Sequence, residues 1–224
     1  PPRSTLFPYT TLFRSGATES SSYYTSFSYT NELGRSVINN FNRITGRINF
    51  SQKIGKFIEF TTNVNVSNSG KEGFNDSRST GSNYFMQSRN LLWPLYWPTD
   101  YQTGEPWTAR YGSYAYNPVY YNDQWENSSK TLRLLANETV TVTILPELIF
   151  KSILSYDNAN TADHLYFSPL HFSGSNDNGS VTETNTNVNK LVSSTTLNYS
   201  TEIASQHNVN ILLGWEAERN LTAY

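Results

Sequence analysis

A period-two alternation of apolar and polar residues is the feature that most constrains the fold of this chain. It is clearest in residues 57–67, FIEFTTNVNVS, and it recurs in residues 42–51, NRITGRINFS. In the first segment the apolar phase consists of Ile58, Phe60, Val64 and Val66. Because successive side chains of a strand point to opposite faces of a sheet, the pattern predicts strands with one apolar and one hydrophilic face.

Seven segments of this kind predict an all-β fold. The expected strands are residues 22–31, 42–51, 57–67, 130–144, 148–157, 190–202 and 208–219. The composition agrees, because Ser, Thr, Asn and 16 Tyr favour strands, turns and hydrated faces over helix interiors. The polar phase also carries a set of charged residues: Arg43, Arg47, Glu59, Arg133, Lys151, Asp157 and Glu216.

The connections between the expected strands alternate between short and long. The short turns are 53–56, 146–147 and 205–207, and the long connections are 33–40, 68–129 and 158–189. Barrels of the outer membrane have this arrangement, because their periplasmic turns are tight and their extracellular loops are long. The sequence therefore predicts part of an antiparallel transmembrane β-barrel. Its apolar phase would face lipid, the seven charged residues would face the lumen, and further strands would close the two free edges.

Four residues depart from this assignment of phases. Glu138 falls on the apolar phase of its strand, while Leu135, Ile149 and Ile153 fall on the polar phase. A β-bulge or a shifted register near Asn137 would remove the conflict at Glu138.

Residues 1–15 are expected to have a different origin from the rest of the chain. The stretch 5–15, TLFPYTTLFRS, resembles the in-frame translation of a sequencing-library adapter. Residues 1–15 also lack the ordered charged, apolar and small-residue regions of a secretory signal. We therefore expect residues 1–15 to be non-native and residues 16–224 to form the barrel domain; the alternative is a genuine aromatic strand at this position.

Several functional classes are disfavoured by composition and motifs. The chain has no Cys, so disulfides, Cys-ligated metals and thiol nucleophiles are excluded. A net charge of −2 without a basic run disfavours nucleic acid as a partner. No apolar run is long enough for a transmembrane helix. The three His are scattered and no catalytic motif occurs, so we expect neither an enzyme nor a metal or other cofactor.

The long connection 68–129 is the most informative part of the chain for function. Residues 83–92 could form a short helix, and aromatic residues are dense after it. The candidates for contact with a ligand or partner are Trp93, Tyr96, Trp97, Tyr101, Trp107, Tyr111, Tyr114 and Tyr116. Exposed rings suit sugar stacking or a partner surface. The alternative is that the rings pack on one another to order the loop. A further set of aromatic residues is expected at the membrane interfaces: Tyr23, Phe27, Tyr29, Tyr156 and Tyr199.

The order and spacing of several motifs resemble SusC/RagA-type TonB-dependent outer-membrane transporters. The motifs are YTNE followed by Gly in 29–34, FNRI in 41–44, a Lys-containing turn in 53–56, LPEL in 145–148 and LLGWE in 212–216. The resemblance covers essentially all of residues 16–224. It implies a barrel of about 22 strands around a plug, of which this chain would supply about a third. The plug and the TonB box would lie outside these residues.

The resemblance implies active import of a large nutrient, an oligosaccharide or a peptide. It further implies a SusD-like surface lipoprotein as partner, energy from the TonB complex through the plug, and contact with outer-membrane lipid in a Gram-negative, Bacteroidota-type bacterium. Two other functions stay open at this point. One is a secreted β-sandwich that acts as a carbohydrate-binding module or adhesin, which would need residues such as Ile58, Phe60, Ile211 and Trp215 to face a dry core. The other is a passive porin.

Overall fold

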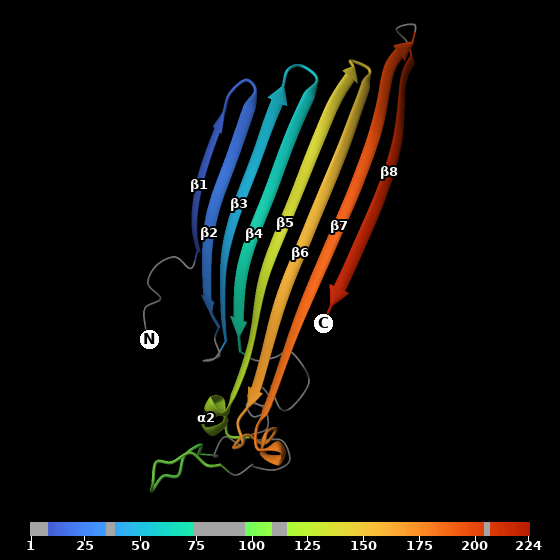
Figure 1. Ribbon diagram of the computed structural model, residues 1–224. Coiled ribbons are helices and arrows are strands. Elements are labelled where there is room, and N and C mark those ends of the chain that lie inside the picture. Colours follow the sequence, from blue (N-terminus) through green and yellow to red (C-terminus); the bar gives the residue numbers. More distant parts are fainter. Residues whose placement is uncertain (1–8, 35–38, 74–96, 109–115, 204–206) are drawn as a thin grey trace.

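The fold is one antiparallel sheet of eight strands, in which each strand pairs with its neighbours in the sequence (Figure 1). The computed structural model describes residues 9–34, 39–73, 97–108, 116–203 and 207–224. The strands are β1 (Tyr9–Ala17), β2 (Ser21–Leu33), β3 (Asn40–Ile54), β4 (Ile58–Glu72), β5 (Trp125–Leu145), β6 (Leu148–Phe167), β7 (Ser180–Ile203) and β8 (His207–Ala223). Helix α2 (Pro118–Tyr121) and two 3-10 turns, Asn122–Gln124 and Ser175–Asp177, lie in the connections. The all-β, antiparallel prediction is confirmed.

All seven expected strands are present, and β1 adds an eighth. β1 lies mostly within the residues expected to be non-native, and it pairs along its whole length with β2. Its residues do not keep the phases of the other strands. Arg14 falls opposite Thr25 in the row that also contains the apolar Ile48, whereas Phe13 falls in the polar phase.

Short and long connections lie at opposite ends of the sheet. Figure 1 shows the β1–β2, β3–β4 and β5–β6 turns at the top, and at the bottom the strand ends from which the longer connections leave. The predicted turn at 146–147 joins β5 to β6 directly. In the β3–β4 turn, Gly55 has a φ of 65°, a left-handed conformation that glycine adopts without steric cost. We refer to the end with the long connections as the loop end.

The strands near the loop end are longer than the sequence pattern predicts. β6 continues to Phe167 and β7 begins at Ser180, so the expected connection 158–189 narrows to residues 168–179. The added parts of β6 and β7 pair with each other from Asn158 opposite Asn189 to Phe167 opposite Ser180. Most residues there are polar, and the few apolar ones, such as Leu165, Tyr166 and Val181, form no regular alternation that would mark these segments as strands. The expected helix at 83–92 lies outside the described residues.

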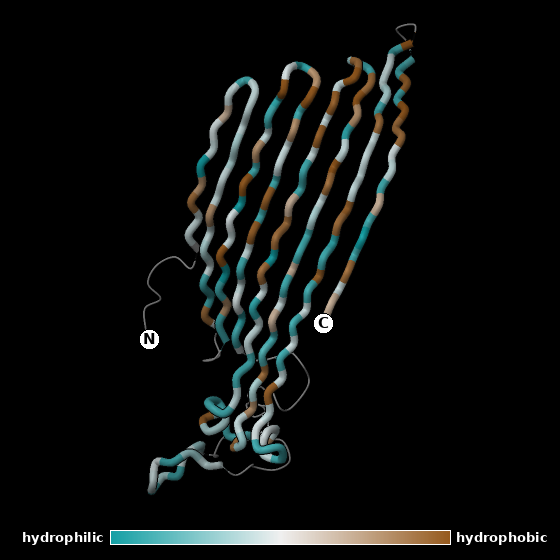
Figure 2. The backbone as a smooth tube through the Cα atoms, in the orientation of Figure 1, coloured by the Kyte–Doolittle hydropathy of each residue, from teal (hydrophilic) through white to brown (hydrophobic). Residues whose placement is uncertain are grey.

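The register places the apolar phases of the strands on one face of the sheet. Residues directly opposite each other in neighbouring strands lie on the same face, and one row across β3 to β5 contains Ile48, Val64 and Ala136. Brown and teal positions alternate along the strands in Figure 2. We call the side with Ile48 and Val64 the apolar face and the other side the polar face.

On the apolar face, apolar residues form a band of limited height. The band covers residues 58–66 of β4, 132–142 of β5, 148–156 of β6 and 191–199 of β7. Each range is close to the roughly 9–11 residues that a tilted transmembrane strand needs. The band therefore has the height of a hydrocarbon layer, although the strands themselves continue well beyond it.

An amide network marks the end of the band toward the loop end. Asn158 Nδ2 donates to Asn189 Oδ1 at 2.6 Å, and the Tyr156 hydroxyl donates to the same oxygen at 3.0 Å. Asn189 Nδ2 donates in turn to Asn187 Oδ1. On β6 and β7, hydrogen-bonded amides replace aliphatic side chains at this level. The neighbouring strands stay apolar slightly farther toward the loop end, at Leu134 and Leu132 of β5 and Leu221 of β8.

The described residues contain no second layer that covers the sheet. Their buried apolar side chains are Tyr116, Tyr121 and Trp125, all at the loop end. Ile211 and Trp215, which a β-sandwich would have to bury, are 50% and 63% exposed. The observed arrangement does not support a β-sandwich.

Glu138 remains on the apolar face, so the expected irregularity near Asn137 is wrong. The β4–β5 ladder is continuous there, and the register shift on β5 falls between Thr143 and Leu145 instead. Thr62 Oγ1 donates a 2.7 Å hydrogen bond to Glu138 Oε2. A cross-strand hydroxyl thus supplies a partner for a carboxylate among aliphatic neighbours. Leu135, Ile149 and Ile153 lie on the polar face, as expected from their phase.

Candidate functional site

The seven charged residues predicted to face the lumen all lie on the polar face. They are Arg43 and Arg47 on β3, Glu59 on β4, Arg133 on β5, Lys151 and Asp157 on β6, and Glu216 on β8. Each falls in the phase opposite to the apolar band. A single hydrophilic face therefore carries both charge signs, contributed by five strands between β3 and β8.

Two members of this set belong to a row of alternating charge that runs across four strands. Arg133 Nε and Nη2 donate to Asp157 Oδ1 and Oδ2 at 2.8 and 2.6 Å, a two-pronged pair. Lys190 lies directly opposite Asp157 on β7, and its Nζ is 2.9 Å from Glu218 Oε1 on β8. Lys190 and Glu218 were not among the predicted site residues, although Glu218 is two residues after Glu216 and so shares its phase.

An aromatic cluster lies at the loop end, where residues 116–125 meet the connection between β6 and β7. The stacked rings of Tyr116 and Phe172 have centroids 3.6 Å apart, and the edge of Tyr121 meets Tyr116 at 5.6 Å. Trp125 stacks on Phe167 at 6.5 Å. The cluster therefore joins residues before β5 to the connection between β6 and β7. Ring packing, the alternative to ligand contact for this loop, accounts for these residues.

His171 is fully buried within the aromatic cluster. Its ring lies 4.1 Å from Phe172, 4.6 Å from Phe167 and 5.4 Å from Tyr121, measured between centroids. The Ser173 N–H donates to Nδ1 at 3.0 Å, so this nitrogen is an acceptor and the imidazole is neutral. Burial lowers the pKa of His171 to about 4, because the charged form would lose its hydration.

Residues 97–108 form a small hairpin that projects from the loop end, drawn in green beyond α2 in Figure 1. We call it the aromatic hairpin. Its Asp100 N–H donates to Glu105 O and its Gly104 N–H to Asp100 O, both at 2.7 Å. The Asp100 carboxylate caps the tip by accepting from the Gln102 N–H at 2.7 Å. Trp97 and Tyr101 are 68% and 88% exposed on this hairpin.

Asn117 holds the base of the aromatic hairpin. Its Nδ2 donates to Pro98 O at 2.7 Å and to Trp107 O at 2.8 Å, on the two arms of the hairpin. Its Oδ1 accepts from the Val119 N–H and so caps α2. Asn117 is 1% exposed, so this one buried amide fixes the hairpin to α2 and to the cluster.

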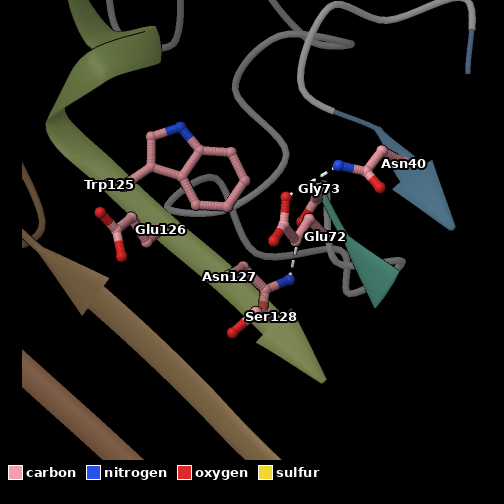
Figure 3. A pocket seen from close by; sticks show the side chains of 7 residues that line it. All are labelled: Asn40, Glu72, Gly73, Trp125, Glu126, Asn127 and Ser128. Atoms are coloured by element: carbon pink, nitrogen blue, oxygen red, sulfur yellow. Dashed lines mark hydrogen bonds between the residues drawn. The ribbon is translucent and has the colours of Figure 1, made fainter. Parts of the chain in front are cut away.

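A hollow of about 440 Å³ lies at the loop end, where β4 ends and β5 begins (Figure 3). It is lined by Asn40, Glu72, Gly73, Trp125, Glu126, Asn127 and Ser128. Asn40 Nδ2 donates to Glu72 Oε2 and Asn127 Nδ2 donates to Gly73 O, both at 2.8 Å. These bonds fix the end of β4 against β3 and β5. The hydrogen-bonded side chains of the hollow therefore serve the junction of β3, β4 and β5, and two carboxylates, Glu72 and Glu126, line it.

The predicted aromatic contact residues divide into three groups. Trp93, Tyr96, Tyr111 and Tyr114 lie outside the described residues. Trp97, Tyr101 and Trp107 lie exposed on the aromatic hairpin. Tyr116 is 5% exposed inside the cluster, where it contacts Tyr121 and Phe172 and cannot present a face to a ligand. Asn117 and His171, which organise the loop end, were missed because an isolated Asn or His carries no pattern.

Among the described residues, no group of three or more His, Cys, Asp or Glu side chains could hold a metal ion. No helix in the described part of the chain is long and apolar enough to cross a membrane.

Solved structures of similar fold show what kind of sheet this is. The chain is similar to the RagAB peptide transporter, with a TM-score of 0.71 and 21% identity over 94% of this chain and 24% of that one. It is also similar to the RagAB peptide importer in its closed-closed state (TM-score 0.72, 20% identity, 95% and 25% covered). For the importer in its open-open state, the TM-score is 0.74 and the identity 21%, over 96% of this chain and 24% of that one. The fold is that of part of a β-barrel.

The chain spans about a quarter of the length of the chains it matches. No protein-family model matches the sequence, and neither does any curated protein. The structural neighbours are transporters rather than enzymes.

Proposed function

We propose that this chain forms part of the wall of an outer-membrane transporter that actively imports a large nutrient. The observation that carries the proposal is the apolar band, which has the height of a hydrocarbon layer and lies on a sheet with the fold of part of the RagAB transporter. The apolar face would contact lipid, and the polar face would line the lumen. β1 and β8 each pair on one side only in the described sheet, so closure would require further strands.

The partners and the energy source are part of the same proposal. We propose a SusD-like surface lipoprotein at the loop end and coupling to the TonB complex through a plug that enters the lumen. Two findings support this proposal: the motifs that resemble SusC/RagA transporters and the structural similarity to RagAB. A Gram-negative, Bacteroidota-type source fits the same family.

A peptide or an oligosaccharide could be the substrate of such a transporter. RagAB is a peptide importer, which favours a peptide. The exposed Trp97 and Tyr101 would also suit stacking on sugar rings, which keeps an oligosaccharide as the second candidate.

Fractionation and uptake test the proposal with the full open reading frame expressed from its source locus. The protein is expected to stay in the membrane fraction in high salt and to be released by detergent. Uptake of a labelled peptide or oligosaccharide is expected to stop when TonB is deleted. A protein that is soluble without detergent would contradict the barrel, and uptake that persists without TonB would identify a passive porin.

We also propose that residues 1–15 are not part of the native barrel wall. Arg14 on the apolar face and Phe13 on the polar face reverse the pattern that the other strands keep. Leu12 and Phe13 are 66% and 67% exposed on opposite faces. Deleting residues 1–15 is expected to change the detergent-extracted folded yield by less than about twofold, because surface changes without buried contacts cost little. A several-fold loss of folded protein would show instead that β1 is a genuine strand.

A further inference from the structure

The aromatic hairpin exposes large apolar side chains although it is ordered. Tyr101 is 88% exposed, Trp97 68% and Trp107 44%. Packing explains the rings of the neighbouring cluster, but it does not explain these three. Tyr and Trp exposed together on an ordered element are typical of the contact points of interfaces, because they bury a large area with few rotatable bonds.

The hairpin is held in one conformation before any partner binds. Three backbone hydrogen bonds close it, including that from the Trp107 N–H to Pro98 O at 3.1 Å, and the buried Asn117 clamps both arms. An ordered element loses less conformational entropy on binding than a mobile loop. This internal ordering therefore favours recognition by the hairpin itself.

Shape and backbone chemistry limit what the hairpin can bind. It projects away from the strands in Figure 1, whereas small-molecule sites are concave. Pro98 and Pro106 lack an N–H, which disfavours addition of a strand to the hairpin edge. A convex element that works through side chains suits a recess on another protein.

The charge of the hairpin defines that recess further. Residues 97–108 contain Asp100 and Glu105 but no Lys or Arg. Complementary charge at the rim of an interface raises the association rate and selects the partner. We infer that the aromatic hairpin docks into a recess of a partner protein that has an apolar floor for Tyr101 and a basic rim for Asp100 and Glu105. Its position outside the membrane rests on the proposed function.

Photo-crosslinking identifies the partner in source cells. The full protein carries p-benzoylphenylalanine in place of Tyr101 or, as a control, in place of Leu170, which is 62% exposed in another connection of the loop end. A single protein is expected to crosslink from position 101 more strongly than from position 170. The absence of such a product would overturn the inference.

Titration of the purified partner against variants tests the chemistry of the contact. Tyr101→Ala is expected to weaken binding roughly 30-fold, the loss typical of a central aromatic contact. The Asp100→Asn/Glu105→Gln double variant is expected to slow association about 10-fold at low salt and to reduce its salt dependence. Leu170→Ala is the matched control and is expected to stay within about twofold.

Asn117→Asp tests whether the ordering of the hairpin matters. It keeps an oxygen for the Val119 N–H but loses both donors to the hairpin, and its 1% exposure prevents contact with a partner. Binding is expected to weaken about 10-fold through lost pre-organisation, with detergent extraction unchanged.

Equal affinities for Tyr101→Ala and Leu170→Ala would overturn the inference. So would a Tyr101→Ala protein that loses binding to a panel of labelled oligosaccharides but still binds the crosslinked protein, because the hairpin would then be a sugar site. Fractionation separates failure of this inference from failure of the proposed function. If the protein is soluble without detergent but Tyr101→Ala still weakens binding to the partner, only the transporter proposal is contradicted.

Discussion

Replacing Ile48 with arginine is expected to lower the free energy of unfolding in lipid bilayers by roughly 2–4 kcal/mol, the range measured for arginine near the middle of lipid-facing strands. Ile48 is 56% exposed on the apolar face, between Thr25 and Val64 in the neighbouring strands. No acidic residue lies directly opposite it, so the new guanidinium would have no counter-charge there. The cost would appear as a lower urea midpoint for the folded protein in vesicles.

Asn63→Arg is the matched control for this experiment. Asn63 lies one step away in the ladder but on the polar face, opposite Asn49 and Asn137. If that face borders water, the substitution is expected to change the unfolding free energy by less than about 0.5 kcal/mol. A larger cost at position 63 than at position 48 would reverse the assignment of the two faces. Small costs at both positions would contradict a membrane-spanning sheet.

The strands could be predicted because their signal is local. In β4, the alternation around Phe60 and Val64 contains both the strand and the face it presents, and no distant residue is needed to interpret it. Register follows from the same information, because a slip by one residue would move Val64 to the polar side. The seven charged residues therefore share one face, as the phases indicate.

The strand ends near the loop end could not be predicted in the same way. Asn158 and Asn189 form part of the ladder, but neither segment alternates there, because polar residues predominate on both faces of β6 and β7 beyond this level. The regular ladder at Glu138 was also unpredictable. Its hydrogen bond comes from Thr62, which lies on another strand and far away in the sequence.

The candidate site was predictable in composition but not in geometry. The density of aromatic residues identified the long connection, yet Tyr101 and Tyr116 have the same side chain and opposite environments. What separates them is Phe172, which stacks on Tyr116 from the connection between β6 and β7. A contact between segments so far apart leaves no trace in the local pattern.

Acidification is expected to open the aromatic cluster through protonation of His171. Burial lowers the folded-state pKa of His171 to about 4, below the ordinary value of 6.5. Above pH 6.5 the imidazole is neutral in both the folded and the unfolded state, so the folded state has its full stability there. This stability falls progressively as the pH is lowered from 6.5 to 4 and then levels off, because the unfolded state binds the proton first. The loss is on the order of 3 kcal/mol.

Hydrogen exchange of the amides in residues 168–179, followed from pH 7 to pH 4 and corrected for intrinsic rates, measures this loss. Protonation at Nδ1 would also break the bond from the Ser173 N–H, so that amide is expected to lose protection early.

Two variants are the controls. His171→Phe removes the titrating group but keeps a ring among Phe167, Tyr121 and Phe172. Exchange protection in this variant should not show the histidine-dependent step. His164→Gln removes the other nearby imidazole, which lies 3.3 Å from Glu183, and should leave that step in place. If the wild type and His171→Phe lose protection in parallel, carboxylates rather than His171 control the opening of the loop end.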